Sequence, residues 1–140
     1  MSKQGSQFRS SSQNKGKILL ADDDPRILSL IQSILESDHF ELTSTEEGEE
    51  AMKMVAENGP NYVLFLLDCT MPKMSGTEVY RQIRAQGLTT PVILISGHHQ
   101  EQVISNINND PNAHFSKKPV NVDELLDQVD RALSEQILTS

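Results

Sequence analysis

Acidic residues that follow two apolar segments are the side chains in this 140-residue chain best suited to chemistry. The acid triplet Asp22–Asp24 comes directly after the apolar run Ile18–Ala21, and Asp68 ends the apolar run Tyr62–Leu67. Gathered carboxylates repel one another, and burial increases the repulsion. A hard divalent cation offsets it, and Mg²⁺ typically takes one or two carboxylates together with waters and phosphate oxygens. The acids therefore predict a Mg²⁺ site if the fold brings them together.

The four acids are not equally strong candidates for a chemical role. A run of acids such as Asp22–Asp24 is often simply solvated, and Asp24 precedes Pro25, a residue suited to the first position of a helix. We therefore expect Asp24 to cap that helix through its side chain. Asp68 is the stronger candidate for chemistry, because it ends a wholly apolar strand and is followed by the turn-forming segment Pro72–Gly76.

Apolar and amphipathic segments alternate from Lys17 onward. Short apolar runs predict five strands, which span Ile18–Ala21, Phe40–Thr43, Tyr62–Leu67, Pro91–Ile95 and Ala113–Ser116. Helical patterns predict five helices. The first opens at Pro25, and the second starts near Thr45 and stops at Asn58–Pro60. The third spans about Thr77–Ala85, the fourth lies around Gln100–Asn108, and the fifth runs from Val122 through Ile137. The apolar stripe of the first helix includes Ile27, Leu30 and Ile31, and that of the last includes Val122 and Leu125.

This alternation predicts an α/β domain with a parallel sheet covered on both faces. Ligands of such sheets bind outside the carboxyl ends of the strands. Five polar residues lie at or just past the ends of four predicted strands: Asp22, Asp23, Asp68, Ser96 and Lys118. The fold is therefore expected to gather them at one edge.

Composition limits the partners and the compartment. The formal net charge is −8, and residues 1–16 carry only three charges, all positive, so removing them leaves −11 on residues 17–140. Such a body repels a phosphate backbone, so direct nucleic-acid binding is not expected.

No apolar run approaches the roughly 18 residues of a membrane helix. The single cysteine, Cys69, excludes an intrachain disulfide, and we expect an inert thiol in a cytoplasmic protein. Residues 1–16 are expected to be a disordered tail or linker ahead of one domain, residues 17–140.

Four segments together resemble the receiver domain of two-component response regulators, of the chemotaxis-regulator type. They are ILLADDDP at 18–25, LLDCTMPKMSG at 66–76, VILISG at 92–97 and KPV at 118–120, in the order and spacing of that family. The resemblance covers residues 17 to about 138. It implies a flavodoxin-like, doubly wound, five-stranded parallel sheet of order 2-1-3-4-5 with five helices on both faces.

The resemblance also implies roles for individual residues. Asp68 is the phosphoacceptor, which takes a phosphoryl group from a phosphohistidine of a histidine kinase or a histidine phosphotransfer protein. The Mg²⁺ ligands are Asp22, Asp23, Asp68 and the backbone carbonyl of Thr70. Lys118 contacts the phosphoryl oxygens and precedes a cis peptide bond. It is chosen over Lys117 because a proline follows it. Ser96 and Phe115 form the conformational switch. Such a domain catalyses only its own phosphorylation and dephosphorylation, and is not otherwise an enzyme.

Other functions stay open at this point. A Mg²⁺-dependent aspartyl-phosphate hydrolase resembles D-x-D at its nucleophile, whereas the segment from Asp68 to Thr70 lacks the second acid. A nucleotide-binding domain of Rossmann type lacks its G-x-G-x-x-G after the first strand. A scaffold domain without phosphorylation would tolerate loss of the acids. The sequence does not decide between a stand-alone regulator and a receiver of a hybrid sensor kinase, and it fixes neither the output partner nor a possible homodimer.

Overall fold

The computed structural model describes residues 14–97 and 100–136. Within these ranges the chain forms five strands: β1 (Lys17–Ala21), β2 (Glu41–Thr45), β3 (Tyr62–Asp68), β4 (Val92–Ser96) and β5 (Ala113–Lys117). The helices are α2 (Pro25–Ser37), α3 (Gly48–Asn58), the short 3-10 helix η1 (Gly59–Asn61), α4 (Gly76–Ala85), α5 (Gln100–Ile107) and α6 (Val122–Ser134).

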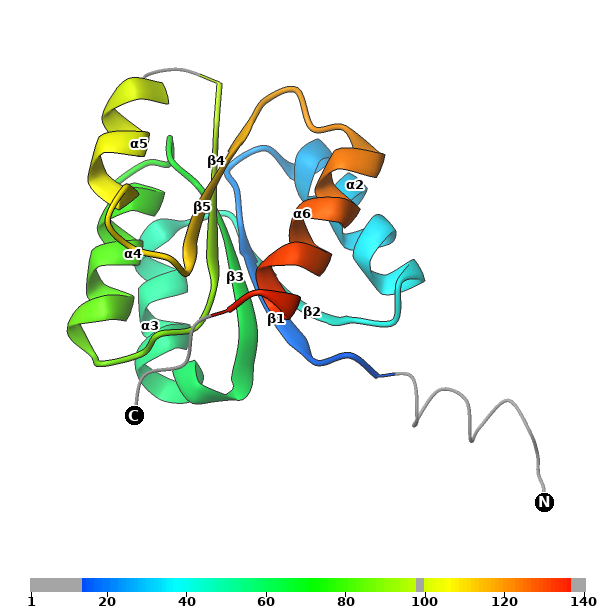
Figure 1. Cartoon of the computed structure of the whole chain (residues 1–140), viewed down its shortest axis with the longest axis horizontal. Helices are drawn as coiled ribbons and strands as arrows, with labels where there is room; N and C mark the ends of the chain where they lie inside the picture. The colour runs from blue at the N-terminus through cyan, green and yellow to red at the C-terminus, as the bar shows by residue number, and fades with distance from the viewer. Residues whose placement is uncertain (1–13, 98–99, 137–140) are drawn as a thin grey trace.

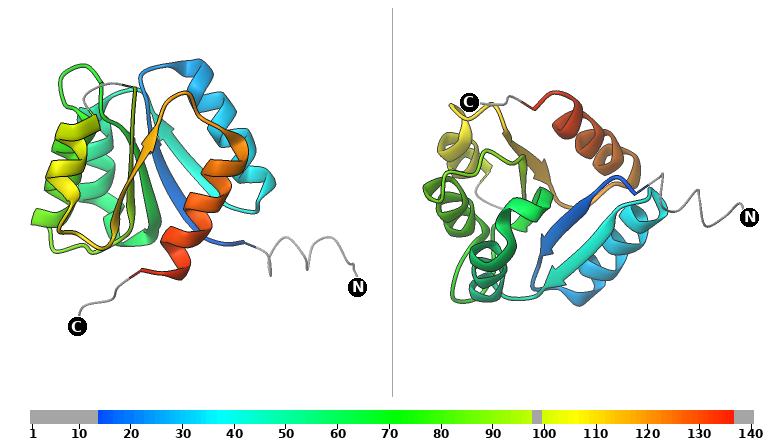
Figure 2. Two further views of the ribbon diagram at one scale, coloured as in Figure 1. Left: turned by 45° about the horizontal axis from the view of Figure 1, so that its top comes forward. Right: turned by 90° about the horizontal axis from the view of Figure 1, so that it is seen from below.

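All four strand pairs are parallel, and the strand order is β2-β1-β3-β4-β5. Helices α2 and α6 cover one face of the sheet, and α3, α4 and α5 cover the other (Figures 1 and 2). The predicted flavodoxin-like fold with strand order 2-1-3-4-5 is confirmed. Because every strand runs the same way, the carboxyl ends of the strands lie at one edge of the sheet.

The sheet separates two apolar clusters. Alternate residues of β1 and β3 point to opposite faces, so Leu19 and Phe65 pack with α3, α4 and α5, while Ile18 and Leu64 pack with α2 and α6. All four of these side chains are fully buried. Burial on both faces explains why the central strands are continuous apolar runs rather than alternating ones.

The second strand and the helix after it lie later in the chain than predicted. Strand β2 extends through Thr45, and α3 begins at Gly48 rather than at Thr45. The hydroxyl of Thr45, which is buried, accepts a hydrogen bond from the amide of Glu47 at 3.2 Å and donates one to Glu50. Thr45 therefore belongs to the sheet and shapes the turn, and helical geometry starts only after it.

Two predicted core residues lie at the surface. Leu30 on α2 is 40% exposed and Val122 on α6 is 44% exposed, so their assignment to the apolar stripes is wrong. The predicted cap is confirmed, since the side chain of Asp24 accepts a hydrogen bond from the amide of Arg26 at 2.9 Å. Ile137, also assigned to the last stripe, lies outside the described residues.

Contacts with the folded body begin just before the predicted domain start. The amide of Lys15 donates to the carbonyl of His39, and the amide of Glu41 donates to the carbonyl of Gly16, both at 2.9 Å. Residues 1–13 of the predicted tail lie outside the described residues. None of the helices in the described part of the chain has the length and apolar character needed to cross a membrane.

Candidate functional site

The carboxyl edge of the sheet holds the polar residues that the sequence placed there. Asp22 follows β1, Asp68 is the last residue of β3, and Ser96 is the last residue of β4. The strand ladder continues past β5, because the amide of Lys118 donates to the carbonyl of Ser96 at 2.9 Å. Four strands separated by up to about a hundred residues of sequence thus deliver their ends to one place (Figure 1).

Three acids converge at this edge. Asp22, Asp23 and Asp68 each offer a carboxylate oxygen, and these oxygens all lie within 4.8 Å of one another. Asp22 and Asp68 are buried, whereas Asp23 is exposed and keeps the cluster open to solvent. A small ion can therefore reach the two buried carboxylates from the side of Asp23.

The two buried carboxylates are held in the same way. The Oδ1 atom of Asp22 accepts a hydrogen bond from the amide of Asp24 at 2.9 Å, and Oδ1 of Asp68 accepts one from the amide of Thr70 at 3.1 Å. Each Oδ2 atom lacks a hydrogen bond of good geometry with the rest of the described chain. One oxygen of each carboxylate is thus fixed by the backbone, and the other is open to a cation.

Lys118 supplies one positive charge to this cluster. Its ammonium nitrogen lies 3.3 Å from Oδ2 of Asp22 and 3.4 Å from Oδ2 of Asp68, and its side chain is 26% exposed. Lys117 is exposed and takes no part in these ion pairs. The Lys118–Pro119 bond is cis, as the resemblance implied.

Burial and the neighbouring charges shift the pKa values of Asp68 and Lys118. Burial raises the pKa of Asp68 to about 6; the Thr70 amide opposes this rise and the Asp22 carboxylate adds to it. Burial of the Lys118 ammonium lowers its pKa, but the carboxylates of Asp68 and Asp22 outweigh this and raise it. Three ionised carboxylates against one ammonium leave a formal charge of −2. Open carboxylate oxygens, net negative charge and solvent access all fit Mg²⁺, which prefers oxygen ligands.

The loop from Cys69 to Ser75 fixes the environment of Asp68. At its far end Ser75 caps α4 in a capping box with Glu78. Gly76 follows, and a Cβ atom there would overlap the carbonyl oxygen of Asp68. The amide of Thr70 is bound to Asp68, but the direction of the Thr70 carbonyl toward a metal stays a prediction.

Cys69 is half-buried, and burial raises the pKa of its thiol to about 11. A thiol with this pKa is almost entirely protonated near neutral pH, and the thiolate is the reactive form. This agrees with the expectation of an inert thiol.

Ser96 and Phe115 lie on neighbouring strands near the acids. Ser96 is buried at the end of β4 and borders a cleft of about 360 Å³ between α4 and α5, which Cys69 and Thr70 also line. Phe115 on β5 is in register with Leu94 of β4 and packs, half-buried, against the core on the side of α3, α4 and α5. Their roles as a switch stay a prediction.

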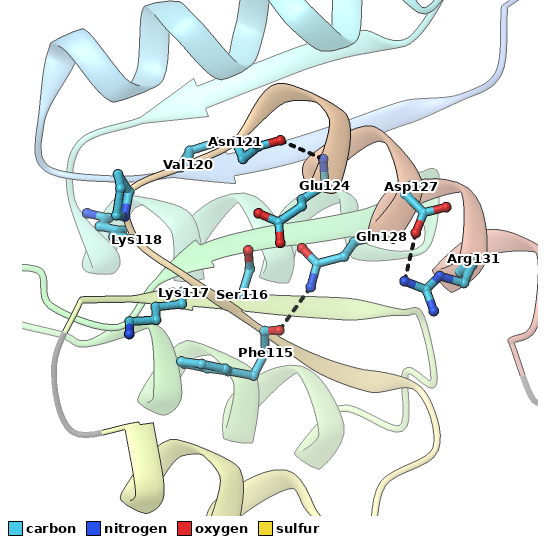
Figure 3. A pocket seen from close by; sticks show the side chains of 11 residues that line it. Phe115, Ser116, Lys117, Lys118, Val120, Asn121, Glu124, Asp127, Gln128 and Arg131 are labelled. Atoms are coloured by element: carbon cyan, nitrogen blue, oxygen red, sulfur yellow. Dashed lines mark hydrogen bonds and ion pairs between the residues drawn. The ribbon is translucent and has the colours of Figure 1, made fainter.

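A cavity of about 640 Å³ lies between β5 and α6 (Figure 3), and none of the three acids lines it. Lys118 lies at its margin, while Phe115, Gln128 and Arg131 line its length. The side-chain amide of Gln128 donates a hydrogen bond to the carbonyl of Phe115 at 3.0 Å. This hydrogen bond occupies part of the free edge of β5. Gln128 carries no sequence signal of this contact, because a polar residue on an amphipathic helix does not indicate which distant strand it meets.

The strand order and the lysine–acid cluster at the carboxyl edge define a class, the CheY-like receivers with a flavodoxin-like fold. Residues 18–130 match the response regulator receiver domain family, and the chain belongs to it. The resemblance seen in the sequence is thereby confirmed.

Curated relatives include longer proteins. The chain is 33% identical over 122 residues to the uncharacterized transcriptional regulatory protein YkoG of Bacillus subtilis, which covers 86% of this chain and 52% of that protein. It is 40% identical over 88 residues to the transcriptional regulatory protein ResD of the same organism, covering 63% of this chain and 35% of ResD. The chain thus spans 35% to 52% of the length of these relatives.

Solved receiver domains share the fold. The receiver domain protein from Clostridium thermocellum has a TM-score of 0.78 and 27% identity, covering 86% of this chain and 95% of that one. The receiver domain of a signal transduction histidine kinase from Syntrophus aciditrophicus has a TM-score of 0.76 and 27% identity, covering 89% and 95%. Similar receivers thus occur both in transcriptional regulators and in a histidine kinase.

Proposed function

We propose that this chain is a Mg²⁺-dependent phosphoacceptor domain in which Asp68 receives the phosphoryl group. The observation that carries the proposal is the state of the two buried acids: Asp68 and Asp22 are each held at Oδ1 by a backbone amide, and each faces Lys118 at Oδ2 without a good hydrogen bond. The resemblance of LLDCTMPKMSG at 66–76 to the receiver family favours Asp68 over Asp22 as the acceptor. A purely structural buried carboxylate is normally hydrogen-bonded through both oxygens. An open oxygen beside a cation is what a nucleophile needs.

The donor proposed here is a phosphohistidine of a histidine kinase or a histidine phosphotransfer protein. Oδ2 of Asp68 forms the new bond to phosphorus, the bond between phosphorus and the imidazole nitrogen breaks, and its electron pair stays on the imidazole. Such transfers need in-line positioning and neutralisation of charge more than covalent chemistry from the protein. Bound Mg²⁺ supplies part of that neutralisation.

The metal ligands proposed are Asp22, Asp23, Asp68 and the carbonyl of Thr70. Each of the three acids offers one carboxylate oxygen within 4.8 Å of the others, and the exposed Asp23 leaves the cluster open to solvent. Lys118, already within 3.4 Å of both buried carboxylates, would turn to the phosphoryl oxygens as a point charge.

The output proposed runs through Ser96 and Phe115. The Ser96 hydroxyl would donate a hydrogen bond to the phosphoryl group, and Phe115 would repack on the adjacent strand. The backbone bond between the amide of Lys118 and the carbonyl of Ser96 couples the ends of β4 and β5, so a shift at one strand end reaches the other. The protein proposed here acts in the cytoplasm, and the domain, whose net charge is negative, is not expected to bind nucleic acid directly.

Two exposed apolar side chains on α2 and α6 support a protein partner. Leu30 on α2 and Val122 on α6 are 40% and 44% exposed, and both helices begin at the edge of the sheet that carries the acids (Figure 1). Exposed apolar side chains on these two helices suit contact with a protein donor.

The test is phosphorylation by acetyl phosphate with Mg²⁺, followed by intact-mass measurement. The wild-type chain should gain one phosphate, and Asp68→Asn should gain none. Asp130→Asn, which changes an exposed acid on α6, is the matched control and should label like the wild type. Normal labelling of Asp68→Asn would remove the assignment. Slow loss of the phosphate, without turnover of excess donor, separates this function from a hydrolase.

A further inference from the structure

The first turn of α3 approaches the loop after Asp68 closely. Gly48 is the first residue of α3 and is buried. A Cβ atom on Gly48 would overlap the carbonyl oxygen of Met74 and lie 2.8 Å from its carbonyl carbon and 2.9 Å from its Cβ. Real Cβ atoms essentially never come within 3.0 Å of another heavy atom in this way. Only glycine lets the helix and the loop come this close, and the atoms that would have to move belong largely to the backbone.

The loop has little freedom to move away. Met71 is buried in the core cluster on the side of α3 and α4, and the amide of Met74 donates to the carbonyl of Pro72 at 2.7 Å. Lys73 has a φ of +69° and lies 3.7 Å from Glu49 of α3, which joins the same two segments again. A displacement at Met74 must therefore pass toward Thr70, because Ser75 is already fixed as the cap of α4.

The helix side of the contact is fixed to the acid site as well. Thr45, at the end of β2, hydrogen-bonds Glu50 of α3 through its hydroxyl. The carbonyl of the same Thr45 accepts a hydrogen bond from the amide of Asp22 at 3.1 Å. The first turn of α3 is thus connected to Asp22 on one side and packed against the loop of Thr70 on the other.

We propose that Gly48 is a positioning residue of the Asp68 site. Because Gly48 has no side chain, α3 packs directly against the loop. This contact sets where the loop holds the Thr70 backbone relative to Asp22 and Asp68. The inference rests on the proposed function, since it assigns to Gly48 an effect on Mg²⁺ binding and phosphorylation.

The test compares two glycine-to-alanine variants at opposite ends of the same helix. Gly48→Ala places the new methyl group against the backbone of Met74. Gly59→Ala is the matched control, because its Cβ would meet only the tip of the Leu88 side chain at 2.8 Å and otherwise sit in ordinary contact distance. Mg²⁺ affinity is measured by titration of the backbone amide signals in NMR spectra, and labelling by acetyl phosphate is measured in parallel.

Gly48→Ala is expected to weaken Mg²⁺ binding by about tenfold or more, the range typical when the support of a metal ligand is disturbed, and to slow labelling. Gly59→Ala should stay within about twofold of the wild type in both, even where it loses stability. If the wild type binds Mg²⁺ and labels, but folded Gly48→Ala does so equally well, this inference fails alone. If the wild type does neither, the proposed function fails and the inference with it.

A measurement on the wild type keeps the inference testable where Gly48→Ala does not fold. Addition of Mg²⁺ should shift the amide signals of Gly48 and Glu49 together with those of the loop from Thr70 to Met74, while Gly59 stays unchanged. Shifts confined to the loop and the acids, with none at Gly48 or Glu49, would overturn the proposal.

Discussion

Replacing Asp68 by asparagine should stabilise the metal-free protein at neutral pH. The pKa of Asp68 is raised from 3.8 to about 6 in the fold, first by burial. A group whose pKa is higher in the folded than in the unfolded state leaves stability intact below about pH 4 and reduces it as the pH rises to about 6. At 1.36 kcal/mol per pKa unit the full effect is about 3 kcal/mol.

The asparagine variant recovers most, not all, of this free energy. The opposing ion pair with Lys118 is already part of the net pKa shift, but the buried side-chain amide of asparagine would lack a full set of hydrogen-bond partners, which costs about 1 kcal/mol. We therefore expect Asp68→Asn to raise the free energy of unfolding by about 2 kcal/mol above pH 7. Near pH 4, where Asp68 is largely protonated, the difference should shrink toward zero.

Urea unfolding followed by circular dichroism measures this directly, since the chain has no tryptophan to report by fluorescence. Both proteins are compared with EDTA at pH 7.5 and at pH 4. Asp130→Asn, an exposed acid, should leave the free energy of unfolding within about 0.5 kcal/mol of the wild type at both values. A metal-free Asp68→Asn protein that is equally or less stable at pH 7.5 would refute the reasoning about burial.

Three further predictions follow from the same contacts. Mg²⁺ at ten times its dissociation constant should add about 1.4 kcal/mol to the unfolding free energy of the wild type and nothing measurable to that of Asp68→Asn. Equal increases in the unfolding free energies of the two proteins, measured by urea titration, would contradict the metal site. Arg84→Ala should lower the free energy of unfolding by about 3 kcal/mol, because Arg84 pairs with Asp110 at 2.6 Å and donates to three backbone carbonyls. Arg81→Ala, which loses one exposed hydrogen bond, should lower it by about 0.5 kcal/mol or less, and similar losses in the two variants would show that the Arg84 contacts are not specific. Iodoacetamide should alkylate Cys69 far more slowly in the folded protein than in urea at pH 8, because the folded thiol has a pKa of about 11; equal rates would contradict its burial.

The placement of Asp22, Asp68 and Lys118 was predictable because strand direction alone determines it. Once the apolar runs are read as parallel strands, residues at their carboxyl ends must meet, whatever the details of packing. The chemistry of the site could be inferred for the same reason, since converging carboxylates need a cation.

The parts that sequence patterns could not predict depend on tertiary contacts. Helical periodicity marks Leu30 and Val122 as apolar, but it cannot tell which side chains of a stripe lie at its exposed margin. The close approach of Gly48 to Met74 joins the start of α3 to the loop before α4, and a glycine at a helix start is not by itself a sign of it. The start of α3 was missed because the contacts of Thr45 with the turn override local helix signals.

The central claim is that Asp68 accepts a phosphoryl group within a Mg²⁺-bound acid cluster. Mapping the phosphate by peptide mass spectrometry, after incubation of the wild-type chain with acetyl phosphate, tests it most directly. With Mg²⁺ the phosphate should appear on the peptide that contains Asp68, and with EDTA it should be absent. A phosphate on another residue, or equal labelling of Asp68 without a divalent cation, would contradict the account.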